Sequence, residues 1–177
     1  MQSHNAKEAG RKPSNIVLIG MPGAGKSTVG VILAKQTARA FLDTDVRIQA
    51  VTGRPLQDIV DTDGYLGLRA IEERVLLDLD VGRHVIATGG SAAYSAAAME
   101  HLGRDGLVVF LHAEPETLQA RIRNFDTRGL AKRPDQSFRD LYDERLALYR
   151  RYADMTVDCD AVSQEAVCAC IVEQMGE

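Results

Sequence analysis

The chain has 177 residues, which is the usual size of one domain. Hydrophobic residues make up 45% and charged residues 26%, ordinary globular values that exclude a disordered, collagen-like or fibrous chain. The formal net charge of −4 argues against a basic nucleic-acid coat and against a polybasic membrane anchor. We therefore expect neither a nucleic-acid partner nor a membrane partner.

The N-terminal segment and the cysteines indicate the compartment. Residues 1–14 lack the apolar core of a signal peptide, and we expect them to form a disordered tail. No stretch approaches the roughly 18 apolar residues of a membrane span. Cys159, Cys168 and Cys170 fit neither a disulfide framework nor a zinc site. They predict small buried or half-buried side chains in a reducing, cytoplasmic protein.

Strand-like and helix-like segments alternate along residues 15–177, which we expect to form a single domain. Short, β-branched apolar runs predict strands at residues 15–20, 40–43, 83–87, 106–111 and 155–157. Helical spacing and end signals predict helices at residues 26–38, 46–80 with breaks at 53–55 and 63–64, 115–123, 138–152, and from Ser163 to Gly176. Residues 124–137 carry many charges with a glycine and a proline, which predicts a loop.

This alternation predicts an α/β fold with three layers, in which a five-stranded parallel sheet lies between helices on both faces. In such sheets ligands bind beyond the carboxyl ends of the strands. The chemistry is therefore expected in the loops that follow Ile19, Phe41, Ala87 and Leu111.

The loop after the first strand carries a phosphate-binding motif. Its sequence GMPGAGKS at 20–27 matches G-x-x-x-x-G-K-[ST] and lies between a buried strand and a helix. Glycines let backbone N–H groups turn toward phosphate oxygens, and the helix start adds the positive end of its dipole. Lys26 is expected to reach the β- and γ-phosphates, and the Ser27 hydroxyl to bind Mg²⁺. The backbone and side-chain groups expected at the nucleotide are those of Gly23, Ala24, Gly25, Lys26, Ser27 and Thr28.

Two carboxylates follow the second predicted strand. Asp43 and Asp45 come directly after Leu42, at the sheet edge that should face the γ-phosphate. One carboxylate could hold Mg²⁺ through water, while the other binds or deprotonates an acceptor hydroxyl. The alternative is that an aspartate here caps the next helix, and one residue can serve both purposes.

An ordered set of motifs resembles the shikimate kinase family. The set comprises GMPGAGKST at 20–28, FLDTD at 41–45, an arginine-centred helix at 64–72, ATGG at 87–90, and ERLALY at 144–149 with YAD at 152–154. The resemblance covers residues 15–160. It implies a P-loop kinase fold and ATP- and Mg²⁺-dependent phosphorylation of the 3-hydroxyl of shikimate, a step of aromatic amino-acid biosynthesis. It also implies a small-molecule partner, and we expect a monomer.

The resemblance also implies roles for individual residues. Asp43 helps to organise Mg²⁺, and Asp45 binds the acceptor hydroxyls and acts as a general base. Arg69 and Arg145 hold the substrate carboxylate, for which the planar fork of arginine suits better than lysine. The two glycines Gly89 and Gly90 line the acceptor site with backbone N–H groups.

A mobile lid at about residues 124–137 is the last implied feature. Arg128 matches the lid arginine that reaches phosphate and substrate, and Arg121 matches an arginine that stacks on adenine. Arg133, which precedes Pro134, is a competing match for the lid arginine. Taken apart from the resemblance, Arg69 is interpreted equally well as an i,i+3 partner of Glu72 on a helix surface. Arg145 alone is interpreted as a surface residue beside acidic neighbours.

Several positions depart from the family pattern around the acceptor pocket. Ser91 replaces a third glycine, Tyr65 an acidic residue and Leu68 an aromatic residue, and RGLA at 128–131 stands where the family has Arg-Pro-Leu-Leu. These changes leave two alternatives open. One is a related kinase for another hydroxy or sugar acid, such as a gluconate-like kinase. The other is a catalytically degenerate nucleotide-binding module.

Overall fold

The computed structural model describes residues 13–122 and 130–176. Its five strands form one parallel sheet in the order β2-β3-β1-β4-β5. The strands are β1 (Asn15–Ile19), β2 (Ala40–Asp43), β3 (His84–Ala87), β4 (Gly106–His112) and β5 (Met155–Asp158). This confirms the predicted fold class. Because β1 lies between β3 and β4, the phosphate-binding loop emerges at the centre of the carboxyl edge of the sheet.

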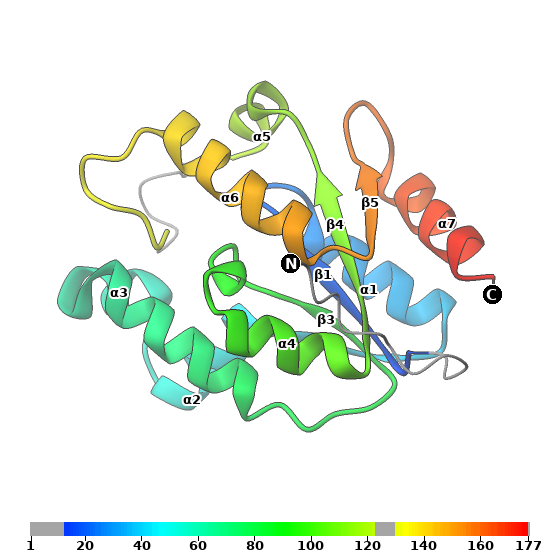
Figure 1. Ribbon diagram of the computed structural model, residues 1–177, viewed down its shortest axis with the longest axis horizontal. Coiled ribbons are helices and arrows are strands. Elements are labelled where there is room, and N and C mark those ends of the chain that lie inside the picture. The colour runs from blue at the N-terminus through cyan, green and yellow to red at the C-terminus, as the bar shows by residue number, and fades with distance from the viewer. Residues whose placement is uncertain (1–12, 123–129, 177) are drawn as a thin grey trace, which may run out of the picture.

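Helices cover both faces of the sheet, as Figure 1 shows. The helices are α1 (Lys26–Gln36), α2 (Thr44–Thr52), α3 (Leu56–Leu77), the short 3-10 helix η1 (Ala92–Tyr94), α4 (Ala96–Arg104), α5 (Pro115–Arg121), α6 (Phe138–Tyr152) and α7 (Gln164–Met175). Helices α1 and α7 lie together on one side, and α3, α4 and α6 lie on the other (Figure 1). The three expected layers are therefore present.

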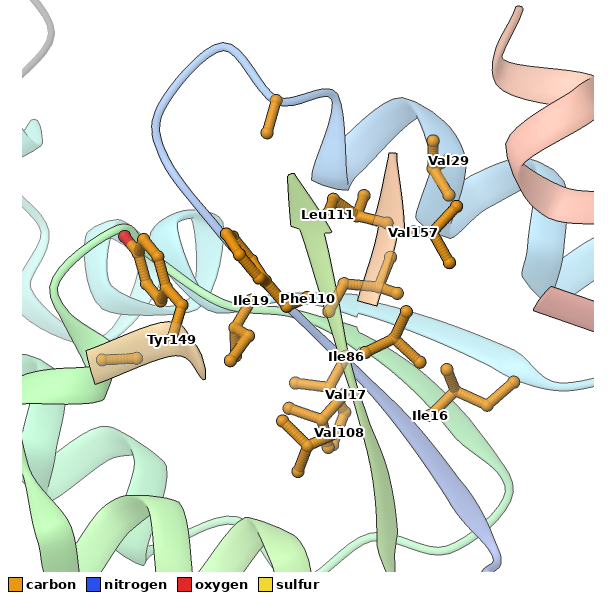
Figure 2. Packing of buried hydrophobic residues seen from close by; sticks show 14 of the residues in the cluster. Ile16, Val17, Ile19, Val29, Ile86, Val108, Phe110, Leu111, Tyr149 and Val157 are labelled. Carbon is orange, nitrogen blue, oxygen red and sulfur yellow. The ribbon is translucent and has the colours of Figure 1, made fainter. Parts of the chain in front are cut away.

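The core forms where alternate side chains of the central strands meet these helices. Val17, Val108 and Phe110 point to one face of the sheet, where the rings of Phe110 and Tyr149 of α6 are 5.1 Å apart (Figure 2). Leu111 and Val157 point to the opposite face, toward α1 (Figure 2). These side chains are at most 4% exposed, so the sheet is buried on both faces, as its continuous apolar runs require.

Local end signals fix several helices at the residues that the sequence predicts. Helix α6 begins after a capping box in which the Ser137 side chain accepts from the Asp140 N–H, and the Asp140 carboxylate accepts from the Ser137 N–H. Ser163 caps α7, and Gly176 ends it with a φ of 68°. The bounds of α6 agree with the sequence prediction at both ends.

The structure adds two elements that the sequence pattern did not predict. Helices η1 and α4 follow β3, and the Ser95 side chain caps α4 by accepting from the Ala98 N–H. The predicted break at Gly64 is a kink with a φ of 74° and a ψ of 173°, and α3 continues on both sides of it. Helices α1 and α5 each end two residues earlier than predicted, at Gln36 and Arg121.

The cysteines agree with their predicted packing. Cys159 and Cys168 are buried and Cys170 is half-buried. Burial raises the pKa of the Cys159 thiol to about 12, which keeps it protonated. Within the described ranges, no helix is both long and apolar enough to cross a bilayer. The predicted tail at 1–14 lies largely outside the described residues.

Candidate active site

A cavity of about 670 Å³ opens at the carboxyl edge of the sheet. Ten of the residues that the sequence singles out line it, namely Gly23, Gly25, Lys26, Ser27, Thr28, Asp45, Gly89, Gly90, Arg121 and Arg145. Ala24 does not line the cavity: it is buried, and its N–H donates to the Met21 carbonyl at 3.1 Å. Most of the predicted nucleotide and acceptor residues therefore share one cavity.

The phosphate-binding loop turns sharply between β1 and α1. Gly23 and Gly25 have φ values of 85° and 99°, in the left-handed region that favours glycine. Gly25 is the residue that precedes α1, so the free N–H groups of the first helical turn face the cavity. The loop thus combines backbone donors with the positive end of a helix dipole.

Lys26 lies inside this loop with its ammonium group bonded to the backbone. Its Nζ donates to the carbonyl oxygens of Gly20 at 2.7 Å and Met21 at 3.0 Å. Burial lowers the pKa of Lys26 to about 8, although the carboxylates of Asp45, Asp43 and Glu72 oppose that shift. The ammonium is therefore still mainly charged at neutral pH.

Asp43 links the loop to the second strand. Its Oδ2 accepts from the Ser27 hydroxyl at 2.6 Å, and its Oδ1 accepts from the N–H groups of Asp45 and Val46 at 3.0 and 3.2 Å. Asp43 is thus the N-cap of α2, as the alternative interpretation expected, and it also contacts the loop hydroxyl. The capping role of Asp43 is therefore confirmed, and its role toward Mg²⁺ stays a prediction.

The loop after β3 approaches two carboxylates closely. A Cβ on Gly89 would lie 2.7 Å from Asp45 Oδ1 and would also collide with Glu72 Oε1. A Cβ on Gly90 would lie 2.7 Å from Arg145 Nη1. Only glycine leaves room for these side chains. The Gly89 N–H is engaged, since it donates to Thr44 Oγ1 at 3.0 Å.

Arg145 and Arg69 converge on a single acceptor from two different helices. Arg145 of α6 is 1% exposed, and its Nη2 donates to the Ala131 carbonyl at 2.9 Å. Arg69 of α3 donates to the same oxygen through its Nη2 at 3.2 Å. The surface interpretation of Arg145 is therefore wrong. The described contacts of Arg69 include no ion pair with Glu72, so the i,i+3 interpretation is also wrong.

Arg69 reaches this point from outside the main cavity. It lines a smaller cavity of about 250 Å³, which shares Glu72 and Ser91 with the larger one. The Ala131 carbonyl therefore lies where the two guanidinium groups meet, and Ala131 itself lines the larger cavity. A ligand carboxylate that takes both guanidinium groups has to replace that carbonyl.

Arg121 and Arg133 lie at different distances from the site. Arg121 lines the cavity, and its Nη2 donates to the Cys159 carbonyl after β5 at 2.7 Å. Arg133, the competing lid arginine, is instead paired with Glu144 at 3.5 Å. Arg128, the first choice, lies outside the described residues, as do residues 124–129 of the predicted lid.

Comparison with known proteins decides the family. A family model described as shikimate kinase matches residues 22–176. A shikimate kinase of Thiobacillus denitrificans is 43% identical over 150 residues, covering 83% of this chain and 82% of the relative. One from Symbiobacterium thermophilum is 39% identical over 171 residues, covering 92% and 97% of the two chains. The chain belongs to the shikimate kinase family.

Solved structures of the shikimate kinase family agree over most of the chain. The shikimate kinase from Acinetobacter baumannii in complex with shikimate is 34% identical, with a TM-score of 0.85 over 92% of this chain and 93% of that one. The enzyme from Aquifex aeolicus is 31% identical, with a TM-score of 0.79 over 92% and 96%. Membership in the family makes this chain an ATP-dependent phosphotransferase with an alcohol acceptor.

The departures from the shikimate kinase pattern have specific places in the structure. Ser91, which stands for the third glycine, donates its hydroxyl to Glu72 Oε2. Leu68 is buried in a small apolar cluster with Ile48, Ile59, Val75 and Ala131, and Tyr65 packs against that cluster. The substitutions therefore alter the wall beside the acceptor residues and leave the phosphate-binding loop unchanged.

Sequence reasoning missed Glu72 as a member of the site. It is 3% exposed and lines the cavity, and its Oε1 has no hydrogen-bond partner among the described residues. Burial raises the pKa of Glu72 to about 7, and the nearby charge of Asp45 acts in the same direction. The available signal was its position three residues after Arg69, one helical turn along α3.

Proposed function

We propose that this protein transfers the γ-phosphoryl group of ATP to the 3-hydroxyl of shikimate. The carrying observation is that Arg69 and Arg145 aim at one point beside the cavity that holds Lys26, Ser27 and Asp45. A pair of convergent guanidinium groups is suited to a carboxylate, which shikimate carries. The likeness to an Acinetobacter baumannii enzyme in complex with shikimate supports the same acceptor.

ATP would bind along the phosphate-binding loop. Backbone N–H groups of Gly23 and of Gly25 to Thr28 would donate to phosphate oxygens, and Lys26 would exchange its carbonyl contacts for the β- and γ-phosphates. Arg121, the last residue of α5, lines the cavity, and its guanidinium face could stack on adenine. Lys26 and Arg121, to which these nucleotide contacts are assigned, both line the cavity.

The oxygen atoms beside Lys26 also suit a magnesium ion. Ser27 Oγ and Asp43 Oδ2 are 2.6 Å apart, and hydroxyl and carboxylate oxygens are the ligands that Mg²⁺ prefers. We propose that these two residues hold the ion with the nucleotide. When bound, Mg²⁺ neutralises charge on the transferring phosphates.

The acceptor hydroxyl would lie at Asp45. This carboxylate faces the close-packed Gly89 and lines the cavity together with Lys26. It would orient the hydroxyl and accept its proton as the bond to phosphorus forms. Since the Gly89 N–H is bonded to Thr44, Gly89 would contribute close approach, and the backbone donor to the acceptor would be the Gly90 N–H.

We also propose that the enzyme is a monomer, as we expect from the sequence. The cytoplasmic location and the absence of nucleic-acid and membrane partners stay predictions from the sequence. Size-exclusion chromatography with light scattering tests the monomer, and a dimer mass would contradict it.

The function is tested by coupled ADP release with ATP, Mg²⁺ and a panel of acceptors that includes shikimate and gluconate. We expect saturable, shikimate-dependent ADP release and a phosphorus NMR signal for a phosphate monoester at the 3-position. Turnover with another acid but not with shikimate would contradict shikimate as the acceptor and identify that acid instead. ATP binding without turnover of any acceptor in the panel would contradict the proposal that the protein is a kinase.

A further inference from the structure

Tyr94 contacts both carboxylate-binding arginines. The Cζ atom of Arg69 lies 3.4 Å from the centroid of the Tyr94 ring, which is a stacking contact. The Cζ atom of Arg145 lies 5.5 Å from the same centroid. One aromatic ring therefore touches the guanidinium groups that two different helices bring together.

Arg69 has few other contacts that fix its guanidinium group. It donates to Ala131 at 3.2 Å, but among the described residues its buried Nε has no hydrogen-bond partner, and the ion pairs within that part of the chain do not include it. An arginine side chain with few contacts samples many rotamers, so its N–H groups do not keep one orientation for a ligand. The ring of Tyr65, 5.2 Å from Arg69 Cζ, faces it as well, at a looser distance than Tyr94.

The ring also reduces the repulsion between the two guanidinium groups. Arg69 and Arg145 carry like charges and lie close enough to share one acceptor oxygen, so they repel each other. The negative face of an aromatic ring attracts a cation, and here both cations lie against one ring. Tyr94 thus offsets part of the repulsion without supplying a carboxylate that would compete with the substrate.

The backbone holds this ring in register with the acceptor site. Tyr94 ends η1, directly after the loop that carries Gly89 and Gly90, and its N–H donates to the Ser91 carbonyl at 3.0 Å. Helix η1 contacts both α3 and α6, the helices that carry the two arginines. The ring is half-buried and lies on a short helical turn with a backbone hydrogen bond, which restricts its position relative to the two arginines.

We propose that Tyr94 is a positioning residue for acceptor recognition: its ring sets the orientation of Arg69, and the spacing between Arg69 and Arg145, for the substrate carboxylate. This rests on the proposed function, because it presumes a carboxylate acceptor. The 3.4 Å contact with Arg69 is made by the ring, so we expect the effect to depend on the ring rather than on the Tyr94 hydroxyl, which lies near Arg145 and Glu144.

Tyr94→Leu and its matched control Tyr94→Phe separate these contributions. We expect Tyr94→Leu to lower kcat/KM for shikimate about tenfold, mainly through KM, as for a cation–π contact of intermediate strength. The KM for ATP should stay within about twofold, and Tyr94→Phe should resemble the unaltered enzyme in both parameters. Equal kinetics for the two variants would overturn the proposal. Matching melting temperatures and ATP affinities show that both variants are folded.

A second readout does not depend on turnover. In protein labelled with ¹⁵N-arginine, the Arg69 Nε–H signal, assigned by its loss in Arg69→Lys, should carry an upfield ring-current shift. That shift should persist in Tyr94→Phe and disappear in Tyr94→Leu. An unchanged Arg69 signal in Tyr94→Leu overturns the proposal whatever the kinetics. Absence of shikimate turnover by the unaltered enzyme would instead contradict the proposed function, and the NMR comparison would still decide the Tyr94–Arg69 contact.

Discussion

Arg69 of α3 and Arg145 of α6 donate hydrogen bonds to the same atom, the carbonyl oxygen of Ala131, at 3.2 and 2.9 Å. Two cations from separate helices gain little stability from sharing one backbone acceptor, because they repel each other. The arrangement is suited to an anion with two oxygens, which can take one guanidinium group on each. Recognition of a carboxylate by this protein would depend on this convergence.

Replacing Arg145 by lysine keeps the charge but removes the fork. We expect Arg145→Lys to raise the KM for shikimate by about 10- to 100-fold, the usual value of one or two lost hydrogen bonds to a charged group. The KM for ATP should not change. Arg139→Lys on the same helix is the control, since Arg139 is exposed and paired only with Asp143 among the described ion pairs. Equal effects of the two substitutions would contradict the assignment.

Asp45→Asn tests the acceptor carboxylate. The amide keeps the size of the side chain but cannot take a proton, so kcat should fall by about 100-fold or more. The phosphate-binding loop is unchanged, and the dissociation constant for ATP, measured by calorimetry, should therefore stay the same. Near-normal turnover would remove Asp45 from the mechanism.

Gly89→Ala tests the close packing beside the acceptor. The added Cβ would meet Asp45 Oδ1 at 2.7 Å and collide with Glu72, so turnover should fall strongly and the melting temperature should drop. Gly103→Ala is the control: its Cβ meets nothing within 4 Å, and it lies inside α4. That substitution should stabilise the protein by about 0.5–1 kcal/mol and leave turnover unchanged. Full activity of Gly89→Ala would show that the loop has more room than described.

Glu72 should make stability depend on pH. Its pKa is raised from 4.5 to about 7 by burial and by Asp45, so the folded protein keeps this proton between those values while the unfolded chain loses it. The free energy of unfolding should therefore fall as pH rises from about 4.5 to 7, and Glu72 adds no further change above that.

Glu72→Gln removes this titration while nearly preserving the shape of the side chain. The difference in unfolding free energy between the two proteins, from urea melts, should change by on the order of 2–3 kcal/mol between pH 4.5 and 7.5. Parallel pH profiles would contradict a raised pKa at this site.

The sequence predicted those parts of the fold that local signals determine. Helix α6 begins at the predicted residue because Ser137 and Asp140 form a capping box within one turn. The phosphate-binding loop was predicted because its glycines and Lys26 are needed at fixed spacing. Helix α4 was missed because it begins with three alanines, which give no apolar periodicity, and its cap at Ser95 is a common residue type.

The acceptor site was only partly predictable, because contacts with residues distant in the sequence determine whether its side chains are buried. Arg145 follows Asp143 and Glu144 and looks like a surface residue, yet Gly90 and Ala131 enclose it. Glu72 looks like an ordinary helix-surface acid until Ser91, after β3, donates to it. In both cases tertiary packing, which leaves no local pattern, decides burial.

In the proposed function, Arg69 and Arg145 bind the acceptor through its carboxylate. The most direct measurement compares initial rates with shikimate and with its methyl ester, which keeps every ring hydroxyl but lacks the charge. We predict saturable turnover of shikimate and a KM for the ester that is higher by about 100-fold or more, with an unchanged KM for ATP. Equal KM values for the two acceptors would contradict the account.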